Sequence, residues 1–311
     1  MANMIATRDA YGEALRELGN KNKDIVVLDA DLSGSTKTAL FKEAFPERFF
    51  NVGIAEQNLI ATAAGLATAG KIPFASTFAV FAAGRAFEII RNSVCYPKLN
   101  VKIAATHAGL TVGEDGATHQ AIEDLSLMRS LPNMVVLSPA DGIEAKQCIY
   151  KAAEYNGPVY IRLGRSKVPV VFDEDYKFEI GKGVELVEGK DITLIATGIM
   201  VEKALRAAEG LEKEGISARV INISTIKPID KEIIIKAAKE TKGIVTIEEH
   251  SIIGGLGSAV AEVLVENHPT YMERVGVEDT FGESGDGGVL LEKYGLSVSN
   301  IMDKAKRILS K

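Results

Sequence analysis

Residues 24–29 read Asp-Ile-Val-Val-Leu-Asp, with four apolar residues in succession rather than in alternation with polar ones. Such a run is typical of a strand that is buried on both faces, as in a parallel sheet. The segment before it carries apolar residues at helical spacing from Ala10 to Leu18, and Gly19 closes it. A helix followed by a fully buried strand is the repeating unit of an α/β fold, so this stretch predicts that fold class.

The same alternation of helix and strand continues along the chain. In the first half we expect strands at 101–106, 133–138 and 158–163 and helices at 122–130 and 142–155. In the second half we expect strands at 192–196, 218–222, 243–247 and 273–277 and a helix at 200–214. This pattern predicts two doubly wound domains with largely parallel sheets, whose ligands gather at the carboxyl ends of the strands.

The boundary between the domains is expected near Pro169 and the charged run 173–175, where regularity lapses. A chain of 311 residues is long enough for two domains of ordinary size. We therefore expect a first domain over 1–172, a linker over 173–185 and a second domain over 186–311.

Composition narrows the class of protein. Hydrophobic residues make up 46% of the chain, charged residues 25%, and the net charge is −6, as in ordinary globular proteins. Because no long basic run occurs, neither nucleic acid nor an anionic membrane is an expected partner. The start of the chain is unlike a signal peptide and no apolar run is long enough to span a bilayer, so we expect a cytoplasmic protein. Cys95 and Cys148 lack metal-ligand spacing and are expected as buried free thiols.

One motif surrounds Glu56, in the segment 53–58, which reads Gly-Ile-Ala-Glu-Gln-Asn and opens an apolar helix that ends near Ala69. A lone carboxylate among apolar residues is costly to bury unless it is hydrogen-bonded. Further along, Phe78 and Phe81 stand three residues apart and can offer flat faces to a heteroaromatic ring. Taken singly, Glu56 could be an acid at the start of a helix, where the helix dipole favours a negative charge. Phe78 and Phe81 could simply belong to the core. Their order along the chain favours a ligand with a heteroaromatic ring, such as an aminopyrimidine.

A second motif, residues 106–120, directly follows a predicted strand and reads Thr-His-Ala-Gly-Leu-Thr-Val-Gly-Glu-Asp-Gly-Ala-Thr-His-Gln. It holds His107 and His119, two of the four histidines in the chain, together with Asp115. One histidine could be an ordinary loop residue. Two histidines and an aspartate at the carboxyl end of a strand favour the binding of a polar substrate.

Together the two motifs resemble the transketolase family, and the resemblance extends over nearly all of the chain, as the pyrimidine-binding and C-terminal domains. It implies that Glu56, Phe78 and Phe81 hold the pyrimidine ring of thiamine diphosphate, with Asp31 near the cofactor. Glu56 would bond a ring nitrogen while carrying or sharing a proton, a state that burial in apolar surroundings favours.

The resemblance also implies a site for sugar phosphates. His107 would meet the phosphate, His119 the carbonyl or C1 hydroxyl, and both would act with Glu56 in catalysis. Asp115 would bond the hydroxyl next to the ketose carbonyl, so that analogues lacking it are rejected. The other phosphate ligands would be Arg8, Ser35 and Arg165. The planar fork of an arginine suits phosphate, although a single arginine taken alone, and Arg162 in particular, fits a solvated surface role.

Two features depart from the family pattern. Gly84 stands where many transketolases carry a tyrosine that lines the cofactor pocket, so that wall must be thinner or completed otherwise. The diphosphate-binding domain is missing, with its Gly-Asp-Gly and the later asparagine that hold magnesium. The Gly-Asp-Gly at 285–287 has no asparagine at a suitable distance, so we expect a turn there and no metal site.

The chain therefore resembles the C-terminal subunit of a split transketolase. A separate N-terminal subunit would supply the magnesium and hold the diphosphate, and two copies of each chain would form the assembly. Self-association is expected through the Phe-rich helix and the apolar stretch 59–69. The implied reaction transfers a two-carbon ketol unit from a ketose phosphate to an aldose phosphate.

Three alternatives share parts of this pattern. The beta subunit of a thiamine-dependent 2-oxoacid dehydrogenase has a similar layout, but a small oxoacid needs no loop such as 106–120. Deoxyxylulose-phosphate synthase shares much of that loop and is normally one long chain. A non-catalytic partner of another enzyme would not require Glu56 or the two histidines. In the second half, the glycines at 254–257 are expected to serve helix packing, and Glu248, Glu249 and His250 to lie at the surface or an interface.

Overall fold

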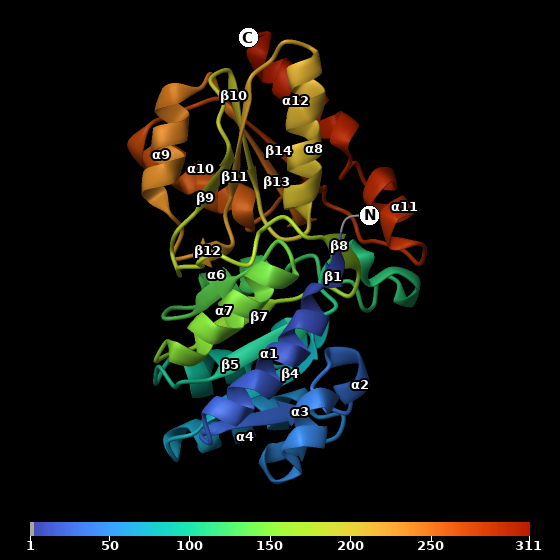
Figure 1. Ribbon diagram of the computed structural model, residues 1–311, viewed down its shortest axis with the longest axis vertical. Coiled ribbons are helices and arrows are strands. Elements are labelled where there is room, and N and C mark those ends of the chain that lie inside the picture. The colour runs from blue at the N-terminus through green and yellow to red at the C-terminus, as the bar shows by residue number, and fades with distance from the viewer. Residues whose placement is uncertain (1–2) are drawn as a thin grey trace.

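A computed structural model describes residues 3–311 as two α/β units stacked end to end (Figure 1). The first unit contains a seven-stranded sheet. In spatial order its strands are β12 (Thr225–Lys227), β6 (Val135–Leu137), β7 (Val159–Arg162), β5 (Lys102–Thr106), β4 (Ile72–Phe78), β2 (Ile25–Asp29) and β3 (Phe49–Asn51). All neighbours in this sheet are parallel except β12, which runs antiparallel to β6.

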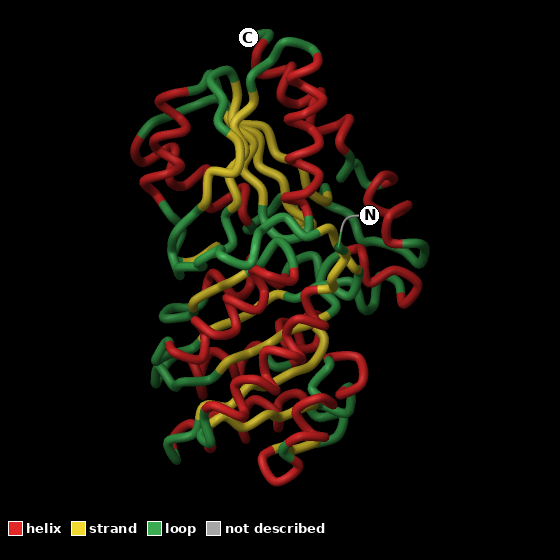
Figure 2. Tube along the Cα trace, viewed as in Figure 1, coloured by secondary structure: helices red, strands yellow, loops and turns green. Residues whose placement is uncertain are grey.

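The second unit contains a five-stranded sheet. In spatial order its strands are β14 (Met272–Val277), β13 (Ile244–Ser251), β10 (Ile192–Ala196), β11 (Ala218–Asn222) and β9 (Val184–Val187). Only β9 is antiparallel to its neighbour. Both sheets are thus mainly parallel and helices flank them (Figure 2), which confirms the predicted α/β class.

Helices cover both faces of the first sheet. On one face α1 (Thr7–Lys21) lies beside α7 (Gly142–Glu154), and both share an apolar cluster with β2. On the other face are α4 (Glu56–Thr68) and two π-helical segments, η2 (Phe81–Arg85) and η3 (Ile90–Cys95). The strands β2 and β5 between these layers are buried along their whole length, as expected for central strands of a parallel sheet.

The second sheet is covered in the same way. On one face lie α8 (Met200–Lys213) and α12 (Val298–Leu309), and on the other α9 (Lys231–Glu240) and α10 (Leu256–Asn267). The apolar cluster that includes α9 and α10 continues into the first unit, where it includes α4. The two units therefore share part of one core.

Shorter elements connect these layers. They are β1 (Met4–Ala6) and β8 (Lys167–Pro169), which pair with each other, α2 (Ser33–Thr36), α3 (Ala39–Ala44), η1 (Pro46–Arg48), α5 (Phe87–Ile89), η4 (Leu110–Asp115), α6 (Asp124–Ser130) and α11 (Gly287–Lys293).

Two short strands depart from the sequence expectations. β12 follows β11 of the second unit in the chain, yet it completes the edge of the first sheet. β9 begins inside the segment 173–185, whose Phe178 is fully buried. Alternation of apolar and polar residues over three or four positions is too short to have revealed either strand.

Two smaller expectations are confirmed and one is corrected. Cys95 and Cys148 are buried and free. The backbone N–H groups that open α10 donate to the carboxylate of Glu248, so this helix start is closed by the protein itself. The turn expected at 285–287 is corrected, because Gly287 and Gly288 begin α11, and Asp286 caps this helix by accepting a bond from the N–H of Val289.

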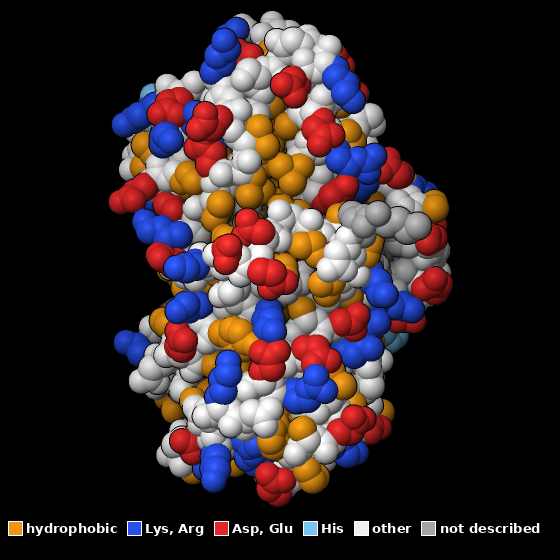
Figure 3. Space-filling model, viewed as in Figure 1, with side chains coloured by type: hydrophobic (Ala, Val, Ile, Leu, Met, Phe, Trp, Pro, Cys, Tyr) orange, Lys and Arg blue, Asp and Glu red, His pale blue; other side chains and the backbone are white. Residues whose placement is uncertain are grey.

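Within residues 3–311, no helix is both long and apolar enough to cross a bilayer. Basic and acidic side chains are interspersed over the face shown in Figure 3.

Candidate active site

Glu56 is the first residue of α4, and its side chain is 1% exposed. Its Oε2 accepts a hydrogen bond of 2.8 Å from Nη1 of Arg85, the last residue of η2, whose side chain is half exposed. The buried carboxylate is thus compensated by a cation and by the positive end of a helix. Sequence reasoning missed Arg85, although its place four residues after Phe81 puts both in one helical segment.

Phe78 and Phe81 lie next to this ion pair and are almost parallel. Their ring centroids are 5.9 Å apart with an angle of 11° between the planes. The guanidinium of Arg85 lies 4.7 Å from the centroid of Phe81, within range of a cation–π contact. A Cβ atom at Gly84 would meet nothing within 4 Å, so the wall is open there and Arg85 covers part of Phe81.

The register of two strands brings the two sequence motifs together. Phe78, the last residue of β4, pairs with Thr106, the last residue of β5. His107 follows with a φ of 58°, and its ring stacks on Phe78 at 3.8 Å. His119 meets Phe81 edge to face at 5.5 Å. Both histidines of the loop 106–120 therefore lie against the paired phenylalanines.

Arg8 joins His107 on one side. Its Nη1 is 3.1 Å from Nε2 of His107 and donates to the carbonyl of Ser35 at 3.0 Å. Because an arginine cannot accept, Nε2 must be the acceptor, and the proton sits on Nδ1, which faces Oγ1 of Thr106 at 2.9 Å. Burial, and then the charges of Arg8 and Arg165, lower the pKa of His107 to about 3. His107 is thus a neutral ring that orients Arg8.

Two observations at Arg8 fit an anionic ligand. Its Nε is buried and, within residues 3–311, has no hydrogen-bond partner. Burial, and the charge of nearby Arg165, lower its pKa. A half-buried guanidinium whose Nε is buried without a partner among the described residues, next to a second cation, is the arrangement that a phosphate would complete.

Arg165 lies near enough to His107 and Arg8 for its charge to lower the pKa of both, and it contacts the loop 106–120. Its Nη1 donates to the carbonyl of Val112 and lies 3.3 Å from Oε2 of Glu114 and 3.7 Å from Oδ2 of Asp115. Asp115 is thus placed beside a cation. The structure gathers His107, His119, Arg8, Arg165 and Asp115 at one edge of the first sheet.

Asp31 occupies the loop after β2 and is exposed, with a φ of 66°. Its hydrogen bonds are to Asn51, which donates from Nδ2 to Oδ1 at 2.9 Å, and not to any other predicted site residue. The same loop is fixed by the buried carboxylate of Asp29, which accepts bonds from Thr36 and Thr38. Sequence reasoning assigned no role to these bracing residues.

Arg162 does not lie at the surface. Its side chain is 7% exposed, and its Nε is 3.0 Å from Oδ2 of the fully buried Asp124. The interpretation of Glu248, Glu249 and His250 as surface groups is wrong for the same reason, since all three are buried. Glu249 and His250 lie where the second unit meets the first, since the N–H of Thr111 donates to Oε1 of Glu249 and the N–H of Ser126 donates to Nε2 of His250. The interface alternative therefore holds for these two residues, within one chain, whereas Glu248 bonds the start of α10 in its own unit.

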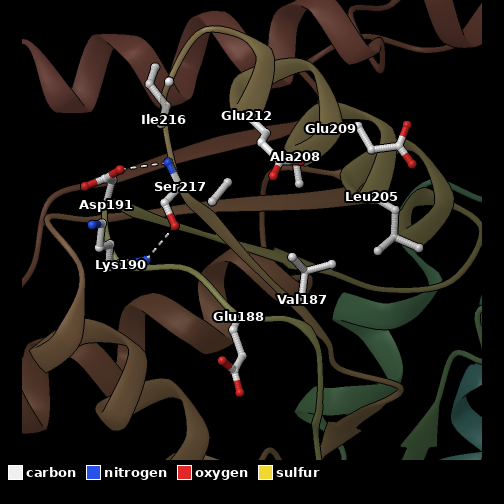
Figure 4. Close-up of a pocket in the computed structure, with 12 residues that line it drawn as sticks. Val187, Glu188, Lys190, Asp191, Leu205, Ala208, Glu209, Glu212, Ile216 and Ser217 are labelled. Carbon is white, nitrogen blue, oxygen red and sulfur yellow. Dashed lines mark hydrogen bonds between the residues drawn. The ribbon is translucent and has the colours of Figure 1, made fainter.

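A hollow in the second unit is lined by residues of β9, of α8 and of the segment that leads into β11, among them Val187, Leu205 and Ser217 (Figure 4). Glu188 and Glu209 at its rim point in different directions (Figure 4). It therefore offers no converging set of polar groups. Nor do residues 3–311 bring together three or more His, Cys, Asp or Glu side chains that could hold a metal ion.

Comparison with known proteins gives a consistent result. Residues 3–171 match the family model of the transketolase pyrimidine-binding domain, and residues 181–301 match that of the transketolase C-terminal domain.

Two relatives of known name are similar to this chain over almost their whole length. A Methanocaldococcus jannaschii protein named "Putative transketolase C-terminal section" is 58% identical over 97% of this chain and 95% of its own. An apulose-4-phosphate transketolase subunit from Phocaeicola vulgatus is 38% identical over 99% of both chains. A solved structure titled "Split gene transketolase, inactive beta4 tetramer" is 64% identical, with a TM-score of 0.93 over 98% of this chain and 99% of that one.

Proposed function

This chain belongs to the transketolase family, and from that premise we propose that it is the C-terminal subunit of a split transketolase. It transfers a two-carbon ketol unit from a ketose phosphate to an aldose phosphate. The observation that carries the proposal is the register of β4 and β5, which sets His107 and His119 against Phe78 and Phe81. We also propose the domain limits 1–172 and 186–311, with 173–185 between them.

The residues around Glu56 fit the ring end of thiamine diphosphate. Phe81 is only partly buried and can offer a face to a ring, while Phe78, which is buried under His107, supports it from behind. The wall at Gly84 is open, and a buried carboxylate lies beside them. Bound thiamine diphosphate would supply the electron sink that lets a carbon–carbon bond break and form. Glu56 would hold a proton at a pyrimidine nitrogen, with Asp31 nearby.

The charged groups around His107 would hold the substrate phosphate. The neutral imidazole accepts from Arg8 and so keeps that guanidinium in place, with its Nε free for a phosphate oxygen. Arg165 and Ser35 complete the set. His119 and Asp115 are then the polar groups for the sugar carbonyl and its neighbouring hydroxyl. We call residues 106–120 the substrate loop.

The diphosphate and its magnesium would be held by a separate N-terminal subunit. A doubly charged diphosphate needs a cation and backbone donors around it. The solved relative titled a split gene transketolase, inactive as a β4 tetramer, supports a need for a second chain. We propose two copies of each chain in the active assembly.

Self-association would use a face built differently from the sequence expectation. Leu59 and Ile60 of the stretch 59–69 are buried in the core. Two of the exposed positions of α4 carry the small residues Ala61 and Gly65, which permit close approach of another chain. Ile54, which is 77% exposed, adds an apolar contact beside them.

Reconstitution tests the proposed function. The chain is mixed with an N-terminal transketolase section from the same genome, thiamine diphosphate and Mg²⁺, and ketol transfer between sugar phosphates is measured. Only the mixture should be active, with either chain alone as the control. Decarboxylation of 2-oxoacids without ketol transfer would favour the dehydrogenase beta subunit instead.

A further inference from the structure

The substrate loop is held in place by the second unit. In its first half, the N–H of Thr111 donates to Oε1 of Glu249 in β13 over 2.6 Å. At its end, Nε2 of Gln120 donates to the carbonyl of Glu283 over 2.9 Å. The segment η4, which contains Thr111, packs against α11. A loop that belongs to the first unit is therefore bonded at two places by residues of the second (Figure 1).

The contact at Glu249 is unusually close. Gly109 has a φ of 82°, and a Cβ atom there would lie 2.2 Å from the carboxyl carbon of Glu249. Only a glycine therefore lets the loop backbone lie on this side chain. Glu249 is fixed in turn, because Nη2 of the buried Arg162 donates to its carbonyl oxygen over 2.9 Å. The backbone that carries the carboxylate is thus bonded to the end of β7 in the first unit.

The residue bonded to Glu249 is the chain neighbour of a residue bonded to the proposed phosphate ligand Arg165. Thr111 precedes Val112, whose carbonyl accepts from the guanidinium of Arg165. Loss of the bond to Glu249 would release Thr111 and shift that carbonyl. Arg165 would then lose the acceptor that aims it toward Arg8 and His107.

We propose that Glu249 is a positioning residue, and that the second unit serves catalysis by setting the shape of the substrate loop through it. The inference rests on the proposed function, since it takes the loop to bind a sugar phosphate. Glu249 is not among the residues proposed to contact the substrate or the cofactor. It acts through the backbone of Thr111 and the side chain of Arg165.

The experiment uses a neighbouring residue as a matched control. Glu248 precedes Glu249 in the same strand and is equally buried, but its carboxylate bonds the start of α10 and not the substrate loop. Glu249→Met and Glu248→Met each replace a buried carboxylate by an apolar group of similar size. Glu249→Gln retains an oxygen that can accept from Thr111, whereas Glu249→Asp keeps the charge but shortens its reach.

Two readouts are measured. In the full chain alone, hydrogen exchange by mass spectrometry should quicken within residues 107–120 for Glu249→Met and not for Glu248→Met. In the reconstituted complex, the KM for a phosphorylated sugar should rise roughly tenfold in Glu249→Met, since small misplacements of binding groups are costly. Glu249→Gln should restore the wild-type KM. If the Glu249→Met variant does not fold, Glu249→Asp takes its place. It should show the same faster exchange within residues 107–120 and the same rise in KM.

The outcomes separate this inference from the proposed function. No ketol transfer by the wild-type complex would overturn the proposed function and with it the catalytic part of the inference. With an active complex, equal KM values or equal exchange for the two methionine variants would overturn the positioning role alone. A Glu249→Gln variant that behaves like Glu249→Met would also overturn it, because the acceptor would then not matter.

Discussion

The carboxylate of Glu56 has a partner that the sequence did not indicate. Glu56 is expected to carry or share a proton with a pyrimidine nitrogen, yet the structure pairs its Oε2 with Arg85. A bound ring must therefore replace Arg85 at this oxygen or bond the other one. Since Arg85 is half exposed and lies over Phe81, it has room to leave without disturbing the core.

Replacement of Glu56 by Gln tests its proposed proton role. Turnover of the reconstituted complex should fall by about 10²–10⁴, the usual effect of losing a positioned proton-transfer group. The measurement is ketol transfer from a ketose phosphate, with circular dichroism of the variant as the control for folding. Turnover close to wild type would contradict the assignment of Glu56.

Replacement of Arg85 by Ala tests the ion pair in the chain alone. The buried carboxylate of Glu56 would lose its partner, and the free energy of unfolding should fall by about 1–3 kcal/mol. Urea unfolding measures this, with Arg91→Ala as an exposed control on the following helical turns. In a double-mutant cycle with Glu56→Gln the effects should not add. Additive losses would mean that the two side chains do not interact.

The meeting of strand ends explains why much of the site could be predicted. Residues that directly follow parallel strands gather at one sheet edge, so the grouping of residues after β2, β5 and β7 follows from the order of the chain. The contact of His107 with Phe78 could not be predicted, because it depends on the register of β4 with β5. The π-helical turn that carries Arg85 also has no sequence signal that periodicity could detect.

Arg165, at the end of β7, provides a test of how these strand ends cooperate. Arg165→Ala should raise the KM for an aldose phosphate about ten- to a hundredfold, as expected for loss of a bond to a charged group. Its dephosphorylated analogue should be affected much less. Lys167→Ala, two residues further on and exposed, is the matched control. Equal effects on both sugars would show that Arg165 serves the fold or the cofactor.

On the scale of the whole molecule, one buried carboxylate joins the two units. Oε1 of Glu144 in α7 accepts bonds from Tyr176, Asn222 and Ser224, at 2.9, 2.8 and 2.7 Å. Asn222 and Ser224 follow the linker in the chain, so the contact crosses the boundary. Burial raises the pKa of Glu144 to about 7. Sequence reasoning could not have found this group, because its partners are far apart in the chain.

The raised pKa of Glu144 makes the stability of the chain depend on pH. Between its usual pKa and about 7 the folded chain retains a proton that the unfolded chain has released. The free energy of unfolding should therefore fall as pH rises through that window, by about 3 kcal/mol from this group. Glu144→Gln should remove this part of the slope, as urea unfolding at pH 5 to 7.5 would show. The same slope in both proteins would contradict the prediction.

The chain alone should neither hold thiamine diphosphate tightly nor catalyse transfer. Glu56, Phe78 and Phe81 would grip only the ring end, and the diphosphate would lack its cation and donors. Calorimetric titration of the purified chain with the cofactor and Mg²⁺ tests this, with the reconstituted complex as the positive control. Sub-micromolar binding by the chain alone would contradict the split-enzyme proposal.

The strand β12 belongs to the second half of the chain but completes the sheet of the first unit, and this limits where the gene can be divided. Its residues Thr225 and Lys227 pair with Leu137 and Val136 at the edge of the first sheet. A gene interrupted between the two units would yield one product with an open sheet edge and another with a strand that has no sheet. Exposed edges invite aggregation. The two units are therefore expected to remain a single reading frame, even in organisms where other parts of the enzyme are encoded separately.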